Sequence, residues 1–145
     1  MVTGIIMQDC IFCKIERGEI PCVKVYETQD VLAFLDLAPV HKGHTLIIPR
    51  KHVVNILDLS TDMASSLQGA IQAIGNGFLR GLKADGFNLG MNNFKAAGQL
   101  VMHAHYHLIP RFSGDGLKLW PQSTYENNGE MNITAEKIIT GIKNG

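Results

Sequence analysis

The stretch VMHAHYHLIPR, residues 101–111, carries three histidines at every second position. Residues 101–109 predict a β-strand, and in a strand every second side chain leaves the same face. His103, His105 and His107 would then form a row of imidazoles, a group whose ordinary pKa lies near neutrality. Three interpretations stay open from these residues alone: a catalytic row, a metal site built on two histidines two residues apart, or a polar strand face.

The rest of the chain predicts strands gathered around one main helix. Ser60 fits an N-cap, and apolar residues then recur at spacings of three and four: Met63, Leu67, Ile71, Ile74 and Phe78. Short links between the other elements favour an α+β fold with an antiparallel sheet, one main helix and a short N-terminal helix. The remaining elements are expected as a helix over residues 11–17, strands over residues 23–27, 31–35, 44–49 and 87–91, and a weak helix over residues 134–142.

Size and charge narrow the class of protein. The 145 residues are 46% hydrophobic, which suits one domain over residues 1–145 with a core at about residues 9–121. Residues 1–8 are expected to be a disordered leader, with Met7 an alternative start, and residues 122–145 a C-terminal extension. Thirteen basic and thirteen acidic residues without a basic run argue against a nucleic-acid partner. Short apolar runs and the missing secretory signal predict a soluble cytoplasmic protein without membrane contact.

Cys10 and Cys13 stand two residues apart, and Cys22 is the third cysteine. Three cysteines cannot all pair within one chain, so the count favours metal binding or free thiols over a disulfide scaffold. The spacing of the first two fits zinc or a redox dithiol, and the βαβ context typical of a dithiol is missing. Two buried reduced thiols are the remaining alternative, and Cys22 is expected to be packed without a partner.

The motif HAHYHLI resembles the histidine-triad signature, and the resemblance extends over roughly residues 9–121. Three segments, the last of which contains the motif, are similar to the Hint-type branch of the histidine-triad (HIT) superfamily: CIFCKIERGEIP (residues 10–21), FLDLAPVHKGHTLIIPRKH (residues 34–52) and GQLVMHAHYHLIPR (residues 98–111). The resemblance implies a HIT-like fold and a nucleotide hydrolase or phosphoramidase. Such an enzyme attacks the α-phosphate of purine nucleoside phosphoramidates or adenylated compounds and releases the nucleoside monophosphate.

The resemblance assigns a role to each catalytic histidine. His105 would be the nucleophile that forms a nucleotidyl-histidine intermediate, with its tautomer fixed by the backbone carbonyl of His103. His107 and His44 would hold phosphate oxygens. The chemistry is reasonable because a neutral imidazole is a good nucleophile near pH 7 and also a good leaving group.

The same resemblance implies a nucleotide site. Asp36 would accept both ribose hydroxyls, although an isolated aspartate there also fits a turn. The loop that precedes the histidine stretch would contact phosphate, although an ordinary hairpin loop looks much the same. The substrate-binding residues expected are Asp36 for the ribose, Asn92, Gly98 and Gln99 for phosphate, and Phe12, Ile15, Ile20 and Phe34 for the base, the last four of which alone would count as core.

The metal-containing branch of the family implies one structural zinc per chain, held by Cys10, Cys13, His52 and His103. The Hint-type relatives imply a homodimer in which the tail around Trp120 and Pro121 reaches the partner's pocket.

One position departs from the family pattern. Many relatives carry serine or threonine after the Gly-Gln pair, whereas this chain has Leu100. The missing hydroxyl predicts sharp discrimination by leaving-group basicity. It also keeps a second function open, that of a nucleotide-binding regulatory protein with vestigial hydrolysis.

Overall fold

The computed structural model describes residues 9–145, so the leader and the alternative start expected over residues 1–8 lie outside the described residues. The chain divides into two compact units after Asp115, and each unit is described by itself. Among the described residues, no helix combines the length and the apolar character needed to cross a membrane.

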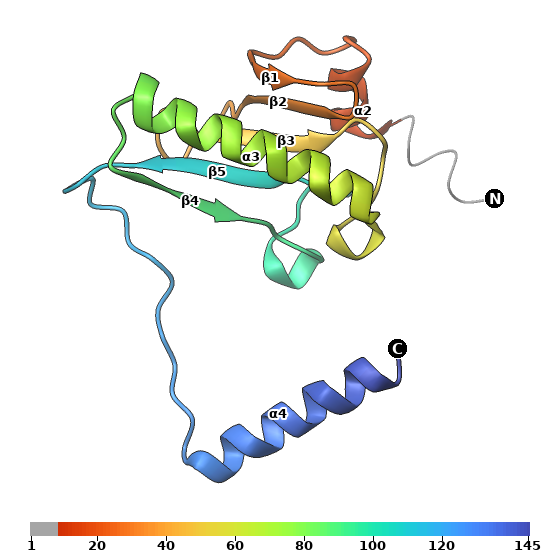
Figure 1. The fold of residues 1–145 in the computed structure, drawn as a ribbon, viewed down its shortest axis with the longest axis vertical. Coiled ribbons are helices and arrows are strands. Elements are labelled where there is room, and N and C mark those ends of the chain that lie inside the picture. Colours follow the sequence, from red (N-terminus) through yellow and green to blue (C-terminus); the bar gives the residue numbers. More distant parts are fainter. Residues whose placement is uncertain (1–8) are drawn as a thin grey trace. The chain divides into compact units, whose positions relative to one another are not determined.

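The first unit is built on a five-stranded sheet with the strand order β1-β2-β3-β5-β4. Every pair of neighbouring strands is antiparallel, and β2 and β3 pair along their whole length, from Val31 opposite Pro49 to Leu35 opposite Thr45. Figure 1 shows this sheet. The predicted α+β fold is therefore confirmed. The strands are β1 (Lys24–Glu27), β2 (Val31–Leu35), β3 (Thr45–Pro49), β4 (Gly86–Gly90) and β5 (Tyr106–Arg111).

The main helix, α3 (Thr61–Gly81), lies across one face of the sheet (Figure 1). It begins as predicted, because the Ser60 hydroxyl accepts a hydrogen bond from the Met63 N–H at 3.3 Å. Its buried side chains pack against every second residue of the central strands, because successive side chains of a strand point to opposite faces of the sheet. This core contains Leu67, Ala70, Ile74 and Phe78 of α3 and Val31, Ala33, Ile47 and Leu108 of the sheet.

The opposite face of the sheet carries a second apolar cluster, which includes the short helix α2 (Ile11–Glu16). Phe12 of α2 packs there against the residues that alternate with the first core, namely Leu32, Phe34, Leu46 and Ile48. The histidine rings reach this second face, since Phe12 contacts the rings of His103 and His105 edge-on. The candidate site and α3 thus lie on opposite faces of one sheet.

The strand expected over residues 101–109 is wrong at both ends, because β5 runs from Tyr106 to Arg111. Its pairing with β3 begins at Tyr106 opposite Ile47. Before that point the chain follows a different neighbour, and the Ala104 N–H donates to the Val53 carbonyl at 2.7 Å. His103 and His105 therefore precede the strand, while His107 lies within it.

The loop between β2 and β3 turns sharply at Gly43, which positions His44. Gly43 has φ of +98°, and a Cβ atom there would come within 2.8 Å of Leu82 Cδ1 and 3.0 Å of Pro110 Cγ. Any larger residue would be strained in its backbone and would collide with these two side chains.

The second unit, Gly116–Gly145, contains one helix, α4 (Asn128–Lys143). It is longer than the helix expected over residues 134–142, because its start is capped further upstream. The Asn127 Oδ1 accepts from the Glu130 N–H at 3.0 Å, while the Glu130 carboxylate accepts from the Glu126 N–H at 2.6 Å. The spacing of Asn127 and Glu130 in the sequence indicates this reciprocal capping, whereas the apolar pattern does not.

Candidate active site and metal centre

The His105 ring is buried, and one of its two nitrogens is fixed by the backbone. Its Nδ1 lies 2.7 Å from the carbonyl oxygen of His103. Because a carbonyl only accepts hydrogen bonds, Nδ1 must carry the proton, and the neutral ring keeps its lone pair on Nε2. The arrangement thus presents the Nε2 atom of His105 as a nucleophile.

A second pair of rings, His44 and His107, forms a directed chain of hydrogen bonds. The Val40 N–H donates to His44 Nδ1 at 3.1 Å, so the proton of neutral His44 is on Nε2. That N–H donates to His107 Nδ1 at 2.9 Å, which in turn places the proton of His107 on its own Nε2. Within residues 9–145, His107 Nε2 is the one buried side-chain nitrogen or oxygen without a hydrogen-bond partner. An unpaired buried donor indicates a missing acceptor, such as a phosphate oxygen.

Burial keeps these imidazoles neutral. Desolvation lowers the pKa of His44 and of His105, and the nearby Asp36 carboxylate only partly opposes it. Burial together with the neighbouring His105 and His44 rings lowers the pKa of His107 to about 4. The rings of His105 and His107 are in contact, with centroids 5.0 Å apart. Near pH 7 the site therefore holds a free lone pair on one ring and an N–H donor on the next.

Asp36 follows directly after β2 and faces the histidines. Its Oδ1 accepts from the Ala38 N–H at 2.9 Å, which is the turn arrangement that an isolated aspartate suggested. Its Oδ2 lies 3.7 Å from His44 Nδ1. The carboxylate is thus both a turn residue and a neighbour of the imidazole chain.

Three of the four residues predicted for a base slot come together beside His105. Phe12 and Phe34 are buried with their ring centroids 5.7 Å apart, and Phe12 lies 5.1 Å from the His105 ring. Ile15 packs against the same cluster, whereas Ile20 is half-buried outside it.

The loop expected to contact phosphate is tied together by its own amides. Asn92 Nδ2 donates to the Gly98 carbonyl at 3.4 Å. Gln99 is buried, and its Oε1 accepts from the Phe94 N–H at 2.8 Å. Its Nε2 donates to the carbonyls of Val54 at 2.6 Å and Val101 at 3.1 Å. The side chain of Gln99 therefore holds two loops in place, a role that the sequence does not predict because it depends on Val54, which is 45 residues away in the chain.

The second cluster joins Cys10, Cys13, His52 and His103, whose ligand atoms all lie within 4.8 Å of one another. His103 Nδ1 is 3.5 Å from both sulfurs, and His52 Nδ1 is 3.3 Å from Cys13 Sγ. Ligands of a tetrahedral zinc ion stand about 3.3–3.8 Å apart, given the usual zinc–nitrogen and zinc–sulfur lengths. The four side chains therefore fit a closed Cys2His2 shell.

The protonation of His103 suits a ligand. Its Nε2–H donates to the Pro49 carbonyl at 2.8 Å, which leaves the Nδ1 lone pair directed at the sulfurs. Burial lowers the pKa of His103 to about 4 and raises the pKa of Cys13 to about 11, the latter also through its hydrogen bond with Cys10. His103 thus serves two sites, its ring in the cysteine cluster and its carbonyl against His105.

Comparison with known proteins gives consistent matches. The HIT domain model matches residues 17–114. An adenosine 5′-monophosphoramidase of Schizosaccharomyces pombe is 37% identical, over 92% of this chain and 98% of the relative. A crystal structure from Streptococcus mutans UA159 is 44% identical, covers 97% of this chain and 89% of the other, and superposes with a TM-score of 0.87. A zinc-bound histidine triad family protein from Mycobacterium smegmatis is 34% identical, covers 94% and 99%, and has a TM-score of 0.74.

Proposed function

This chain belongs to the HIT family, and on that premise we propose that it is a nucleotide hydrolase that acts through a nucleotidyl-histidine intermediate. Its substrates are purine nucleoside phosphoramidates or adenylated compounds. The observation that carries the proposal is the hydrogen-bond pattern that sets opposite tautomers on two neutral rings, with a lone pair on His105 Nε2 beside a buried, unpartnered N–H on His107. The phosphoramidase activity of the S. pombe relative supports the substrate class.

The reaction has two steps. In the first, His105 Nε2 attacks the α-phosphorus, a new N–P bond forms, and the bond to the leaving group breaks. The leaving group departs with the electron pair of its bond to phosphorus, a leaving amine takes up a proton from solvent water, and the nucleotidyl group stays on the ring. In the second step water attacks the same phosphorus and loses a proton to solvent, the N–P bond breaks with its electron pair returning to His105 Nε2, and the nucleoside monophosphate leaves. One difficult substitution becomes two easier ones.

The remaining residues bind and orient the substrate. The His107 Nε2–H donates to a phosphate oxygen, and its electrostatic effect grows as charge develops in the transition state. His44 supports this donor through His107 Nδ1. Asp36 accepts the ribose hydroxyls with its exposed lone pairs. The substrate-binding set also includes Asn92 and Gly98 for the phosphate, Gln99 as the side chain that holds their loop in place rather than as a phosphate ligand, and Phe12, Ile15, Ile20 and Phe34 for the base.

We also propose one structural zinc per chain on Cys10, Cys13, His52 and His103. When bound, the ion fixes the His103 ring and with it the carbonyl that orients His105. The Cys2His2 donor set and the zinc-bound M. smegmatis relative support this assignment. None of the three cysteines, Cys10, Cys13 and Cys22, forms a disulfide, in keeping with a reducing, cytoplasmic location.

Metal analysis of protein purified without chelators tests the zinc proposal. One equivalent of zinc is expected in the wild type and none in Cys13→Ser, with a lower thermal midpoint in the variant because ligands arranged by folding make binding energy into folding energy. Cys22→Ser is the matched control and keeps its metal. A wild type that never contains zinc contradicts the assignment.

Leu100 favours a second candidate function, a nucleotide-binding regulator with vestigial turnover. The residue is exposed and has no hydroxyl to offer a leaving group. Incubation with adenosine 5′-phosphoramidate separates the two functions: the hydrolase releases AMP over many turnovers, whereas the regulator binds AMP and leaves the substrate intact. Guanosine 5′-phosphoramidate in parallel reports the base preference.

A further inference from the structure

The guanidinium of Arg50 connects three segments of the first unit. Its Nε donates to the Thr28 carbonyl at 2.8 Å, and its Nη2 donates to Glu27 Oε2, also at 2.8 Å. Its Nη1 donates to Glu16 Oε1 at 3.3 Å. The first two partners belong to the hairpin of β1 and β2, whereas Glu16 is the last residue of α2. One planar group with several fixed donors therefore joins α2 to the hairpin.

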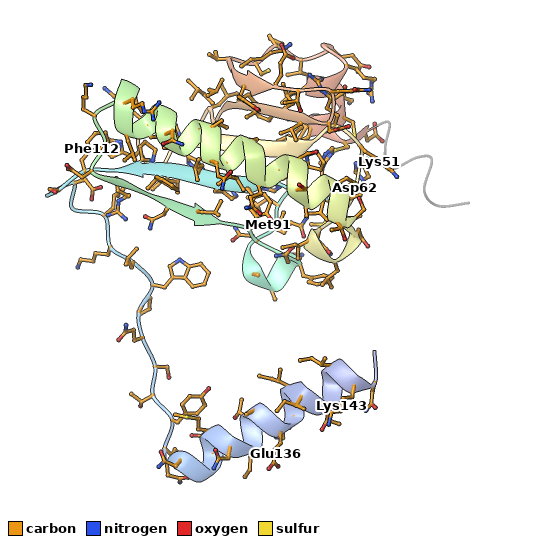
Figure 2. The ribbon with its side chains drawn as sticks, viewed as in Figure 1. Lys51, Asp62, Met91, Phe112, Glu136 and Lys143 are labelled. Atoms are coloured by element: carbon orange, nitrogen blue, oxygen red, sulfur yellow. The ribbon has the colours of Figure 1, made fainter. Side chains whose placement is uncertain are left out.

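The helix α2 has few other polar attachments. It contains six residues, too few to be stable without contacts to the rest of the unit. Within residues 9–145, α2 makes hydrogen bonds to distant segments through two side chains only, that of Cys13 in the cysteine cluster and that of Glu16 at Arg50. Arg50 follows β3 directly, and the next residue, Lys51, is labelled in Figure 2. The contact with Arg50 is thus the polar attachment of the helix end that lies away from the cysteine cluster.

The candidate base slot takes its residues from the two parts that Arg50 joins. Phe12 and Ile15 come from α2 and Phe34 comes from β2, with the ring centroids of Phe12 and Phe34 5.7 Å apart. Glu16 follows Phe12 by four residues, so the two side chains lie on the same side of the helix, one turn apart. The position of the α2 residues relative to β2 therefore depends on whether Glu16 stays bound to Arg50.

The contact between Arg50 and Glu16 is partly shielded from water. Their side chains are 24% and 29% exposed, whereas those of the neighbouring Lys24–Glu27 pair are 53% and 48% exposed. An isolated ion pair on an open surface contributes little, but a guanidinium that shares several partners in a network contributes more. Loss of the Arg50 guanidinium would also leave the Thr28 carbonyl without this donor.

We propose that Arg50 is a positioning residue for the nucleotide base. It holds α2 against the hairpin and so keeps Phe12 and Ile15 where they contact a purine. This inference rests on the proposed nucleotide site. The catalytic rings of His105 and His107 are oriented by other partners, the His103 carbonyl and the His44 ring. Arg50 therefore acts on binding of the base rather than on the chemical steps.

The test compares the binding of AMP with that of ribose 5-phosphate, which lacks the base. Calorimetry on the full chain gives both dissociation constants. The wild type should bind AMP more tightly, and Arg50→Met should weaken AMP binding about three- to tenfold while ribose 5-phosphate binding changes by less than about twofold. Lys24→Met is the matched control, because it removes the other cation bound to Glu27 without touching α2, and it should keep both constants.

A double-mutant cycle and amide hydrogen exchange show whether the effect passes through α2. Glu16→Ala should also weaken AMP binding, and adding it to Arg50→Met should cause little further loss, because both substitutions break the same contact. The amides of Lys14 and Arg17, whose hydrogen bonds close the turns of α2, should exchange faster in Arg50→Met. The amides of the central strand β3 should keep their exchange rates.

Four results would overturn this inference. Equal weakening of AMP and ribose 5-phosphate, or faster exchange in β3 as well as in α2, would show that Arg50 stabilises the whole unit instead. Additive effects of the two substitutions would show that Arg50 does not act through Glu16. A wild type that binds both ligands equally well has no base slot to position. The binding constants do not depend on turnover, so a chain that binds AMP as expected but never hydrolyses adenosine 5′-phosphoramidate would overturn the hydrolase alone.

Discussion

At the residue scale, the site depends on which nitrogen of each imidazole carries the proton. Backbone groups decide this for three rings: the His103 carbonyl for His105, the Val40 N–H for His44, and the Pro49 carbonyl for His103. The side-chain alternation of residues 103–107 predicts that rings gather. It does not predict their tautomers, because these depend on the backbone conformation at His103 and Val40 and, for the His103 ring, on Pro49, which is distant in the chain.

The half-buried His107 makes stability depend on pH. Its pKa is about 4 in the folded chain against 6.5 when solvated, so the unfolded chain binds its proton more readily between these values. The stabilisation is complete above pH 6.5 and is lost as pH falls toward 4. Between pH 7.5 and 4.5 the wild type should lose about 2 kcal/mol more unfolding free energy than His107→Gln. Urea unfolding at both pH values measures the loss of unfolding free energy in each protein. Equal losses in the wild type and in His107→Gln would contradict the lowered pKa of His107.

At the scale of elements, the sequence predicts a helix or strand correctly where the interactions that form it lie within a few residues. Ser60 and the spacing of apolar residues predict α3 because capping and amphipathicity act within a few residues. The same reasoning misplaces β5, since the alternation of residues 101–109 continues while the hydrogen-bond partner changes from Ile47 in β3 to Val53 beyond it. Register against a distant segment is a tertiary property that periodicity does not contain.

Gln99 shows how one side chain stabilises two elements. Gln99→Leu leaves the Phe94 N–H and the carbonyls of Val54 and Val101 without their partner. We expect a loss of about 2–4 kcal/mol in unfolding free energy and a raised KM, because the loops then move relative to the histidines. Gln99→Glu still accepts from Phe94 but places a carboxylate oxygen against the carbonyls of Val54 and Val101, so its loss should be at least as large. Denaturant titration measures the unfolding free energy of both variants. An unchanged unfolding free energy in Gln99→Leu would show that this side chain does not stabilise the two loops.

At the scale of the whole molecule, the HIT domain match ends at residue 114, and the chain divides after Asp115. Trp120, 84% exposed, belongs to the second unit, and α4 has no buried residue. Exposed apolar residues in such numbers suit an assembly in which another surface covers them. The expected assembly is a homodimer with Trp120 and Pro121 at the partner's pocket.

Light scattering at micromolar concentration tests the dimer. A mass of two chains is expected, with lower kcat/KM in Trp120→Ala because the tail then no longer completes the neighbouring pocket. Tyr125→Ala, an exposed aromatic in the same unit, is the control. A mass of one chain at this concentration rejects the arrangement.

The proposed reaction depends on a covalent intermediate on His105, and the stereochemistry at phosphorus shows whether that intermediate forms. Hydrolysis of one diastereomer of adenosine 5′-phosphorothioamidate in oxygen-18 water gives a chiral product. Two successive in-line displacements, first by His105 and then by water, predict overall retention of configuration, and His105→Ala should lower the rate by several orders of magnitude while still binding AMP. Inversion of configuration would mean a single direct attack by water, with no nucleotidyl group ever bound to His105.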